Sequence, residues 1–207
     1  ALLATHDITK SFGTVTALAG VSLTIASGES VAIMGPSGSG KSTTVRLING
    51  LIEPTSGQVL YDGLTPEKHG KEIRKRVGFV FSDAESQIVM PRVADDVAFS
   101  LRRFKLQRDE VRRRVTEALD RFELADRAEH SPHTLSGGEK QMLALASVLV
   151  IQPDTIIADE PTTLLDLRNR LRLRELLDGL PQQQLISTHD LELAATAQHV
   201  AVVHRSE

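Results

Sequence analysis

The strongest chemical signal in the sequence is the run GPSGSGKS, Gly35 to Ser42, which fits the spacing G-x-x-x-x-G-K-[ST]. Glycines at these positions let backbone N–H groups turn inward around phosphate oxygens, and the following helix adds the positive end of its dipole. The lysine of this pattern reaches the β- and γ-phosphates of a nucleotide, and the hydroxyl after it binds magnesium. We therefore expect an ATP-phosphate site with these members: Gly35, Pro36, Ser37, Gly38, Ser39, Gly40, Lys41, Ser42 and Thr43.

Two acidic residues end the apolar run TIIADE, and a histidine follows the apolar run QQLIST. A buried carboxylate is costly unless it is paired or used, and parallel strands open their ligand crevice at their carboxyl ends. Asp159 suits a carboxylate that holds magnesium through a water, and Glu160 suits a base that polarises an attacking water. His189 could donate a hydrogen bond to a transferred phosphate. The alternatives are a pair of solvated acids and a surface or structural histidine.

A third signal is LSGGE, Leu135 to Glu139, which precedes the apolar helix-like run MLALASVLV. Ser136 and Glu139 have the S-x-x-E spacing of a capping box. Gly137 and Gly138 lie between them, although a glycine inside a helix costs up to about 1 kcal/mol against alanine. Because glycine has no Cβ, both positions would let an anion approach the backbone N–H groups of the helix start. We expect this turn to receive a phosphate.

The elements around these motifs indicate a mainly parallel sheet. VAIMG runs into the phosphate loop as a strand, and TTVRLINGL follows as a helix that ends near Gly50 and Pro54. Later apolar runs alternate with helix-like stretches, which is typical of buried parallel strands. The expected strands are ITKSFG, VSLTI, SVAIMG, 58–61, 77–81, TIIADE, QQLIST and HVAVVH.

The segment from about Ser82 to Gln141 is polar and helix-prone and lacks such runs, so we interpret it as an inserted helical subdomain. Apolar residues recur within it at helical spacing, and the arginines at 112–114 point elsewhere. We expect those arginines to form a solvated helix face, since the chain has only 3% aromatic residues and a net charge of −3, which argues against nucleic acid as a partner. The expected apolar face consists of Val111, Val115, Ala118, Leu119 and Phe122.

The length and composition of the chain limit the class of protein to which it can belong. A chain of 207 residues with 41% hydrophobic and 25% charged residues suits one domain with an ordinary core. It contains no cysteine, so disulfides and thiolate zinc sites are excluded. No run approaches the roughly 18 to 20 apolar residues of a membrane span. If the protein works at a membrane, another subunit must hold it there.

The runs GPSGSGKST, LSGGE, IIADEP, TTLLD and STHD occur in the order of the ABC ATPases, and the chain resembles that family over nearly its whole length. The resemblance implies an α/β P-loop NTPase fold of ABC ATPase type: a mainly parallel core sheet, an antiparallel β-subdomain and an inserted helical subdomain. Residues 1–81 and 142–207 would form the core with its β-subdomain, and about 82–141 the helical subdomain. By resemblance Asp159 ends the Walker B strand, Glu160 is the catalytic base and His189 is the switch histidine. Phe12 would stack on adenine, with a core phenylalanine as the alternative.

The same resemblance implies that the protein works as a pair, either a homodimer or a dimer with a close paralogue. The signature residues of one copy would close over ATP held by Lys41 of the other. Leu165 and Asp166 belong to the D-loop by this resemblance. The residues expected to act in trans are Ser136, Gly137, Gly138, Glu139 and Asp166.

Two segments are similar to the ATPases of energy-coupling-factor (ECF) importers: VGFVFSDAESQIVMPRVADDVAF, and LSGGEKQMLALASVL, which resembles the biotin type more than the commoner version ending in QQR. This likeness implies a transmembrane coupling subunit, a substrate-binding membrane subunit and a peripheral place at the cytoplasmic face of the plasma membrane. Biotin is the favoured substrate, with cobalt, nickel and other vitamins left open. The alternatives are another transporter type, a soluble ABC ATPase acting on nucleic acid or ribosomes, and a small-molecule kinase, which would leave LSGGE and STHD without a purpose.

Two departures from the family pattern stand out. The Q-loop glutamine, which approaches magnesium, aligns with Ser82, whose shorter side chain would need a bridging water. Gln87 matches a second glutamine of the pattern, so we do not assign it to magnesium. The chain also ends soon after HVAVVHRSE, where relatives usually continue through a strand-turn and a short tail; a trimmed and a compact chain both fit this.

Overall fold

The computed structural model describes residues 2–204, and its centre is a parallel sheet of five strands in the order β5-β6-β7-β3-β8. All four neighbouring pairs are parallel. The runs β5, β6 and β7 are buried along their whole length, which is why their sequences are apolar without alternation. The predicted mainly parallel sheet is confirmed. Its strands are β3 (Ser30–Met34), β5 (Val77–Val80), β6 (Thr155–Asp159), β7 (Gln183–Ser187) and β8 (His199–Val202).

A second, antiparallel sheet has the order β2-β1-β4, with β1 (Leu3–Phe12), β2 (Val15–Ile25) and β4 (Ser56–Tyr61). Leu3, Ile25 and Tyr61 pack into one buried cluster with side chains of β3, β5, β6 and β7. The hydroxyl of Tyr61 also lies 3.0 Å from Thr155 Oγ1, inside the core. This sheet is therefore attached to the central sheet by a continuous core, as the expected β-subdomain requires.

Two helices connect these sheets. The helix α1 (Lys41–Ile48) begins two residues before the predicted TTVRLINGL and stops before Gly50, whose φ of 69° a residue with a Cβ rarely adopts. The helix α2 (Pro66–Arg76) was missing from the prediction. It buries only Gly70 and Ile73, so it has little apolar periodicity, but proline at its first position and three basic residues in its last turn were usable signals.

The predicted helical subdomain is present as α3 (Val93–Leu101), α4 (Arg108–Arg121) and α5 (Gly137–Leu149). The expected face of α4 is buried at Val115, Ala118 and Leu119, while Arg113 pairs with two acids of the same helix. The predicted boundary after residue 141 falls inside α5, which is one continuous helix. The remaining helices are α6 (Leu167–Asp178), α7 (Leu191–Ala194) and the 3₁₀ turns Glu85–Gln87, Arg102–Phe104, Ala125–Arg127 and Pro132–Thr134.

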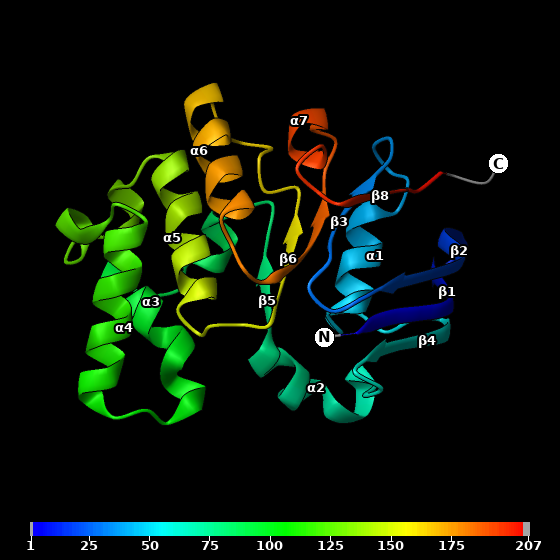
Figure 1. The fold of residues 1–207 in the computed structure, drawn as a ribbon, viewed down its shortest axis with the longest axis horizontal. Helices are drawn as coiled ribbons and strands as arrows, with labels where there is room; N and C mark the ends of the chain where they lie inside the picture. The colour runs from blue at the N-terminus through cyan, green and yellow to red at the C-terminus, as the bar shows by residue number, and fades with distance from the viewer. Residues whose placement is uncertain (1, 205–207) are drawn as a thin grey trace.

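One end of the molecule gathers the parts that carry the sequence motifs. Figure 1 shows the strands β6 and β7 pointing upward, and the first turns of α1, α5 and α6 together with α7 lie at that same upper end. The first turn of α5 is far from the first turn of α1 in this view, with α6 and α7 between them. Among the described residues, no helix is long and apolar enough to cross a membrane.

Candidate active site

The phosphate loop between β3 and α1 is folded around its own lysine. Lys41 is 6% exposed, and its Nζ donates hydrogen bonds to the carbonyl oxygens of Gly35 (2.9 Å) and Pro36 (3.2 Å). Gly40 has φ of 97°, and a Cβ there would lie 2.7 Å from the carbonyl oxygen of Ala17, so glycine is required. The hydroxyl of Ser39 is buried without a partner among the described residues. The loop thus keeps a cation and a free hydroxyl group together.

The carboxylate of Glu160 lies between Lys41 and His189. Its Oε1 is 3.4 Å from Lys41 Nζ, and its Oε2 is 2.7 Å from His189 Nδ1 and accepts from the His189 backbone N–H at 3.2 Å. The three groups come from the start of α1 and the ends of β6 and β7, which adjoin in the parallel sheet. The structure therefore brings together all three residues that the sequence predicted as catalytic.

Asp159, one residue earlier, is 1% exposed and fully partnered. Its Oδ1 accepts from the hydroxyls of Ser42 and Ser187, both at 2.7 Å, and its Oδ2 lies 3.3 Å from an Arg46 terminal nitrogen. Sequence reasoning missed Ser187 and Arg46. Ser187 is detectable as a polar residue at the end of an apolar strand, whereas Arg46 is one of several basic residues on helices and carries no distinguishing signal.

The backbone of Glu160 is strained, with φ of 50°, which non-glycine residues adopt only at a cost. Its N–H donates to the Ser187 carbonyl oxygen at 2.9 Å and also lies 3.2 Å from Ser187 Oγ. Because β6 continues straight through Asp159, this turn directs consecutive acids to different neighbours. Asp159 reaches Ser42, and Glu160 reaches Lys41 and His189.

Phe12, at the end of β1, is 52% exposed, so the alternative of a core phenylalanine is wrong. Lys10 Nζ lies 5.1 Å from the centre of its ring, and one face of the ring is thereby engaged by a cation. Its expected stacking on adenine stays a prediction.

The segment after β5 holds the two departures from the family pattern. Ser82 is half-buried and directly follows this strand. The Gln87 side chain folds back, accepting from the Phe81 N–H at 3.2 Å and donating to the Phe79 carbonyl oxygen at 3.4 Å. Both polar ends of the Gln87 side chain are therefore bonded to the backbone of its own loop and of β5.

The predicted capping box at LSGGE is present. Ser136 Oγ accepts from the Glu139 N–H at 3.3 Å, and Glu139 Oε2 accepts from the Ser136 N–H at 2.8 Å. The hydrogen bond from the Ser136 N–H lowers the pKa of Glu139. Glu139 is therefore held in the ionised form at the positive end of the α5 dipole.

The structure gives one of the two glycines a further reason. A Cβ on Gly138 would lie 2.4 Å from the side-chain nitrogen of Asn169 in α6, whereas a Cβ on Gly137 would meet nothing within 4 Å. Gly138 thus has a reason inside its own chain, the close packing of α5 on α6. Only Gly137 is exposed to solvent, with open space where a Cβ would lie. Asp166 caps α6 by accepting from the Asn169 N–H at 2.8 Å, so this acid also has a structural use.

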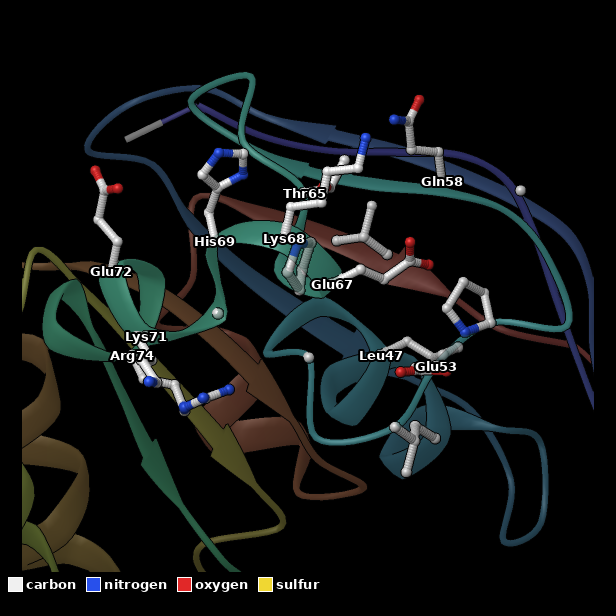
Figure 2. A pocket seen from close by; sticks show the side chains of 17 residues that line it. Leu47, Glu53, Gln58, Thr65, Glu67, Lys68, His69, Lys71, Glu72 and Arg74 are labelled. Atoms are coloured by element: carbon white, nitrogen blue, oxygen red, sulfur yellow. The ribbon is translucent and has the colours of Figure 1, made fainter.

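A pocket of about 970 Å³ lies away from these motifs, between the end of α1, β4 and α2 (Figure 2). Acidic and basic side chains line it in equal number, and no sequence motif contributes to it. We therefore place the candidate active site at the phosphate loop and not at this pocket. Its charged side chains are Glu53, Glu67, Lys68, Lys71, Glu72 and Arg74.

The chain is similar in sequence to a known family and to proteins named as its members. A family model described as ABC transporter matches residues 18–163. The chain is 43% identical over 194 residues to the biotin transport ATP-binding protein BioM of Rhizobium etli, covering 94% of this chain and 86% of that protein. It is 42% identical over 200 residues to a putative ABC transporter ATP-binding protein of Bartonella quintana, covering 97% and 88%.

Two solved structures are similar over almost the whole chain. One is the dimeric structure of a post-hydrolysis state of the ATP-binding cassette MJ0796 bound to ADP and Pi, with 32% identity, a TM-score of 0.88 and coverage of 97% and 94%. The other is cbiO1 from Clostridium perfringens, part of the ABC transporter complex cbiONQ, with 33% identity, a TM-score of 0.85 and coverage of 97% and 83%. The expected ABC ATPase fold is confirmed, and the chain belongs to the ABC transporter family as one of its ATP-hydrolysing subunits.

Proposed function

We propose that the residues around Glu160 hydrolyse ATP held by the phosphate loop, and that this chain is the motor subunit of an ECF-type importer. The observation that carries the enzymatic part is the Glu160 carboxylate, held between Lys41 (3.4 Å) and His189 (2.7 Å). When Lys41 turns to the phosphates, Glu160 is free to polarise a water for attack on the γ-phosphorus. As the oxygen of this water bonds to the γ-phosphorus, the bond from that phosphorus to the bridging oxygen of ADP breaks and the proton of the water passes to the Glu160 carboxylate. His189 donates a hydrogen bond to the phosphate that is released with ADP.

Magnesium fits the residues present at this site. The chain offers the Ser42 hydroxyl and the Asp159 carboxylate, 2.7 Å apart, which is hard-oxygen chemistry. Among the described residues no group of three or more His, Cys, Asp or Glu side chains that could hold a metal occurs. Magnesium usually keeps several waters and takes one or two protein oxygens together with substrate phosphates. When bound, the ion would neutralise charge on the phosphates. Ser42 would hold it directly, Asp159 through a water, and Ser82 only through a further water.

The pairing of two copies rests on the placement of the motifs. The first turn of α5, with Ser136 and Gly137, lies at the same end of the molecule as the phosphate loop but apart from it (Figure 1). A second copy, turned to face the first, would bring the signature of each to the phosphates of the other. The relative MJ0796 was solved as a dimer, which supports this arrangement. Ser136, Gly137, Gly138, Glu139 and Asp166 would then act in trans.

The transport system is inferred from two relatives. BioM is named as a biotin transport protein, and cbiO1 is part of the complex cbiONQ. We infer a transmembrane coupling subunit and a substrate-binding membrane subunit, which hold this chain at the cytoplasmic face of the membrane. Biotin is the favoured substrate, ahead of a metal ion or another vitamin. Nucleic acid is not among the partners we propose.

The variants Glu160→Gln and Lys41→Ala test the enzymatic part. Glu160→Gln should bind ATP, lose hydrolysis and accumulate as a dimer in ATP and Mg²⁺, measured by phosphate release and light scattering. Lys41→Ala should lose nucleotide affinity. Normal ATP binding by Lys41→Ala, or unchanged hydrolysis by Glu160→Gln, would show that the roles are misassigned.

The identity of the transport system is tested separately. The chain should be purified from its native membrane under mild detergent, and the small membrane proteins that accompany it should be identified. We expect two kinds, one of which binds radiolabelled biotin. Recovery with a single pair of ordinary permease subunits would point to another transporter type, and recovery with ribosomes would point to a soluble ABC ATPase.

A further inference from the structure

Basic side chains gather at the end of the molecule opposite the phosphate loop. The segment RRFKLQR, residues 102–108, holds four basic residues and no acid, and α2 ends in RKR, residues 74–76. In Figure 1, α2 and the end of α3 both lie at the lower end, away from the first turns of α1, α5 and α6. We call five exposed residues of these segments the basic end: Arg74, Lys75, Arg102, Arg103 and Lys105.

The side chains of the basic end have no acidic partner in the part of the chain that the structure describes. Arg76, the last residue of α2, is different, because it pairs with Asp62 at 2.6 Å and with Asp154 at 2.7 Å. Arg113 on α4 likewise pairs with two acids of its own helix. The chain therefore neutralises arginines close to the basic end and leaves the charges of the basic end itself uncompensated.

Two of these charges lie near one another although they come from different subdomains. The pKa of Arg103 is lowered, chiefly by partial burial and also by the positive charge of Arg74. The guanidinium of Arg103 lies 5.3 Å from the centre of the Phe104 ring, and that of Arg102 lies 5.3 Å from the centre of the Phe99 ring. These contacts hold the guanidinium groups in place. Like charges held near one another repel, and an anion placed against them removes this cost.

We propose that the basic end is a docking surface for the phosphate groups of anionic lipids. The chain as a whole has a net charge of −3, so attraction to an anionic surface has to come from a local group of cations. Each Lys or Arg close to such a surface strengthens binding about fivefold. The choice of lipid as the occupant rests on the proposed place of this chain at the cytoplasmic face of a membrane. The proposed pairing of two copies uses the opposite end of the molecule and leaves the basic end uncovered.

The composition of the basic end favours a lipid surface over a protein partner. The core of a protein interface is apolar and depleted of charge, and the basic end has the opposite composition. Phe99 is 43% exposed and lies beside Arg102. An exposed aromatic ring next to basic side chains suits the headgroup level of a bilayer. Nucleic acid offers the same phosphate chemistry and is therefore one outcome of the test.

Binding to vesicles tests the proposal directly. The whole chain, without ATP or Mg²⁺, is sedimented with vesicles of phosphatidylcholine and phosphatidylglycerol, and separately with vesicles of phosphatidylcholine alone. We expect binding to the anionic vesicles only, and a loss of this binding as salt is added, because salt screens the attraction. Equal binding to both kinds of vesicle, or binding to neither, would overturn the proposal.

A matched pair of double variants places the binding on the molecule. Arg74→Gln with Arg103→Gln should lower the partition coefficient for anionic vesicles about 25-fold, at about fivefold for each charge. Arg121→Gln with Arg168→Gln removes the same charge from exposed arginines outside the basic end and should lower it less than about twofold. Arg74→Lys with Arg103→Lys keeps the charge and should keep the binding. Because the replaced side chains are exposed, the fold should persist, and a thermal melt checks this.

Two competitors distinguish the sources of phosphate. Inorganic phosphate, added at constant ionic strength, should leave the chain on anionic vesicles. Release by inorganic phosphate would mean that the basic end binds a small anion, which overturns lipid docking. Single-stranded RNA should bind more weakly than anionic vesicles. Tighter binding of RNA that is lost in Arg74→Gln with Arg103→Gln would make nucleic acid the partner and would also overturn lipid docking.

The outcomes separate this inference from the proposed function. The vesicles contain no membrane subunit, so their result is independent of the proteins that accompany the chain from its native membrane. If the chain is recovered with membrane subunits but ignores anionic vesicles, lipid docking is overturned and the transport role stands. If the two glutamine double variants lose binding equally, the basic end is not the docking surface. If the chain binds anionic vesicles through the basic end but is recovered with ribosomes, lipid docking stands and the transport role fails.

Discussion

Replacing the two signature glycines by alanine, one at a time, should have opposite effects on stability. Gly137→Ala adds a Cβ that meets nothing within 4 Å, at a position inside the first turn of α5. The exchange removes the conformational cost of a glycine in a helix, so we expect a gain of about 0.5 to 1 kcal/mol in the free energy of unfolding. For a chain of this size about 1 kcal/mol corresponds to roughly 2 to 4 °C in Tm.

Gly138→Ala differs because its Cβ would lie 2.4 Å from Asn169 Nδ2, and the end of that side chain would have to move. Overpacking of this kind costs about 1 to 3 kcal/mol, of which the helix propensity of alanine returns up to about 1. The net expectation is a loss on the order of 1 kcal/mol. The variant Gly138→Ala with Asn169→Ala relieves the contact and should recover most of the loss.

The effects of these two glycine substitutions on dimerisation and hydrolysis should not parallel their effects on the free energy of unfolding. Gly137→Ala should bind ATP normally as a single copy but lose ATP-driven dimerisation and hydrolysis, because its new methyl group stands where the partner's phosphate must reach the backbone N–H groups. Calorimetric Tm, ATP titration and light scattering in the Glu160→Gln background measure the three quantities. A Gly137→Ala chain that dimerises and hydrolyses like the parent would refute the idea that this backbone receives a phosphate.

Three further variants follow from individual contacts. Glu139→Ala should lower the free energy of unfolding by about 1 kcal/mol, as loss of a cap does. The pKa of Glu139 is lowered from 4.5 in the folded chain, so the stability that this carboxylate contributes is present above pH 4.5 and is lost as pH falls through the lowered pKa. Glu139→Gln should therefore make the free energy of unfolding fall less steeply as the pH is lowered below 4.5. Asp96→Ala should cost on the order of 3 kcal/mol in urea unfolding, since it leaves the N–H groups of Val89 and Met90 without their buried acceptor, and Asp96→Asn should cost less. Phe12→Ala should weaken ATP binding by about 1 to 3 kcal/mol in calorimetry without changing Tm, because the ring is half exposed; unchanged affinity would remove Phe12 from the adenine site.

The parts of the fold that the sequence predicted are those with a strong pattern. Buried parallel strands have continuous apolar runs, so β6 and β7 were found within a residue of their ends. The helix α2 was not predicted because only two of its residues are buried and its kink at His69 interrupts the helical periodicity of apolar residues. The packing of α6 against α5 could not be predicted from the sequence either, since packing between helices depends on the shape of their surfaces and not on the spacing of apolar residues along the chain. The reason for Gly138 therefore became visible only in the structure.

Ser187 illustrates how far sequence reasoning about the site could go. Asp159 and Glu160 were predicted from their place at the end of an apolar strand, and that argument depends only on the cost of burying charge. The same argument applies to Ser187, a hydroxyl that is 0% exposed at the end of the neighbouring strand. Its hydroxyl donates to Asp159, and its carbonyl oxygen accepts from the strained Glu160 N–H, so one residue supports both acids. A buried polar residue at the end of any strand next to Walker B is therefore a candidate for positioning, even where no motif contains it.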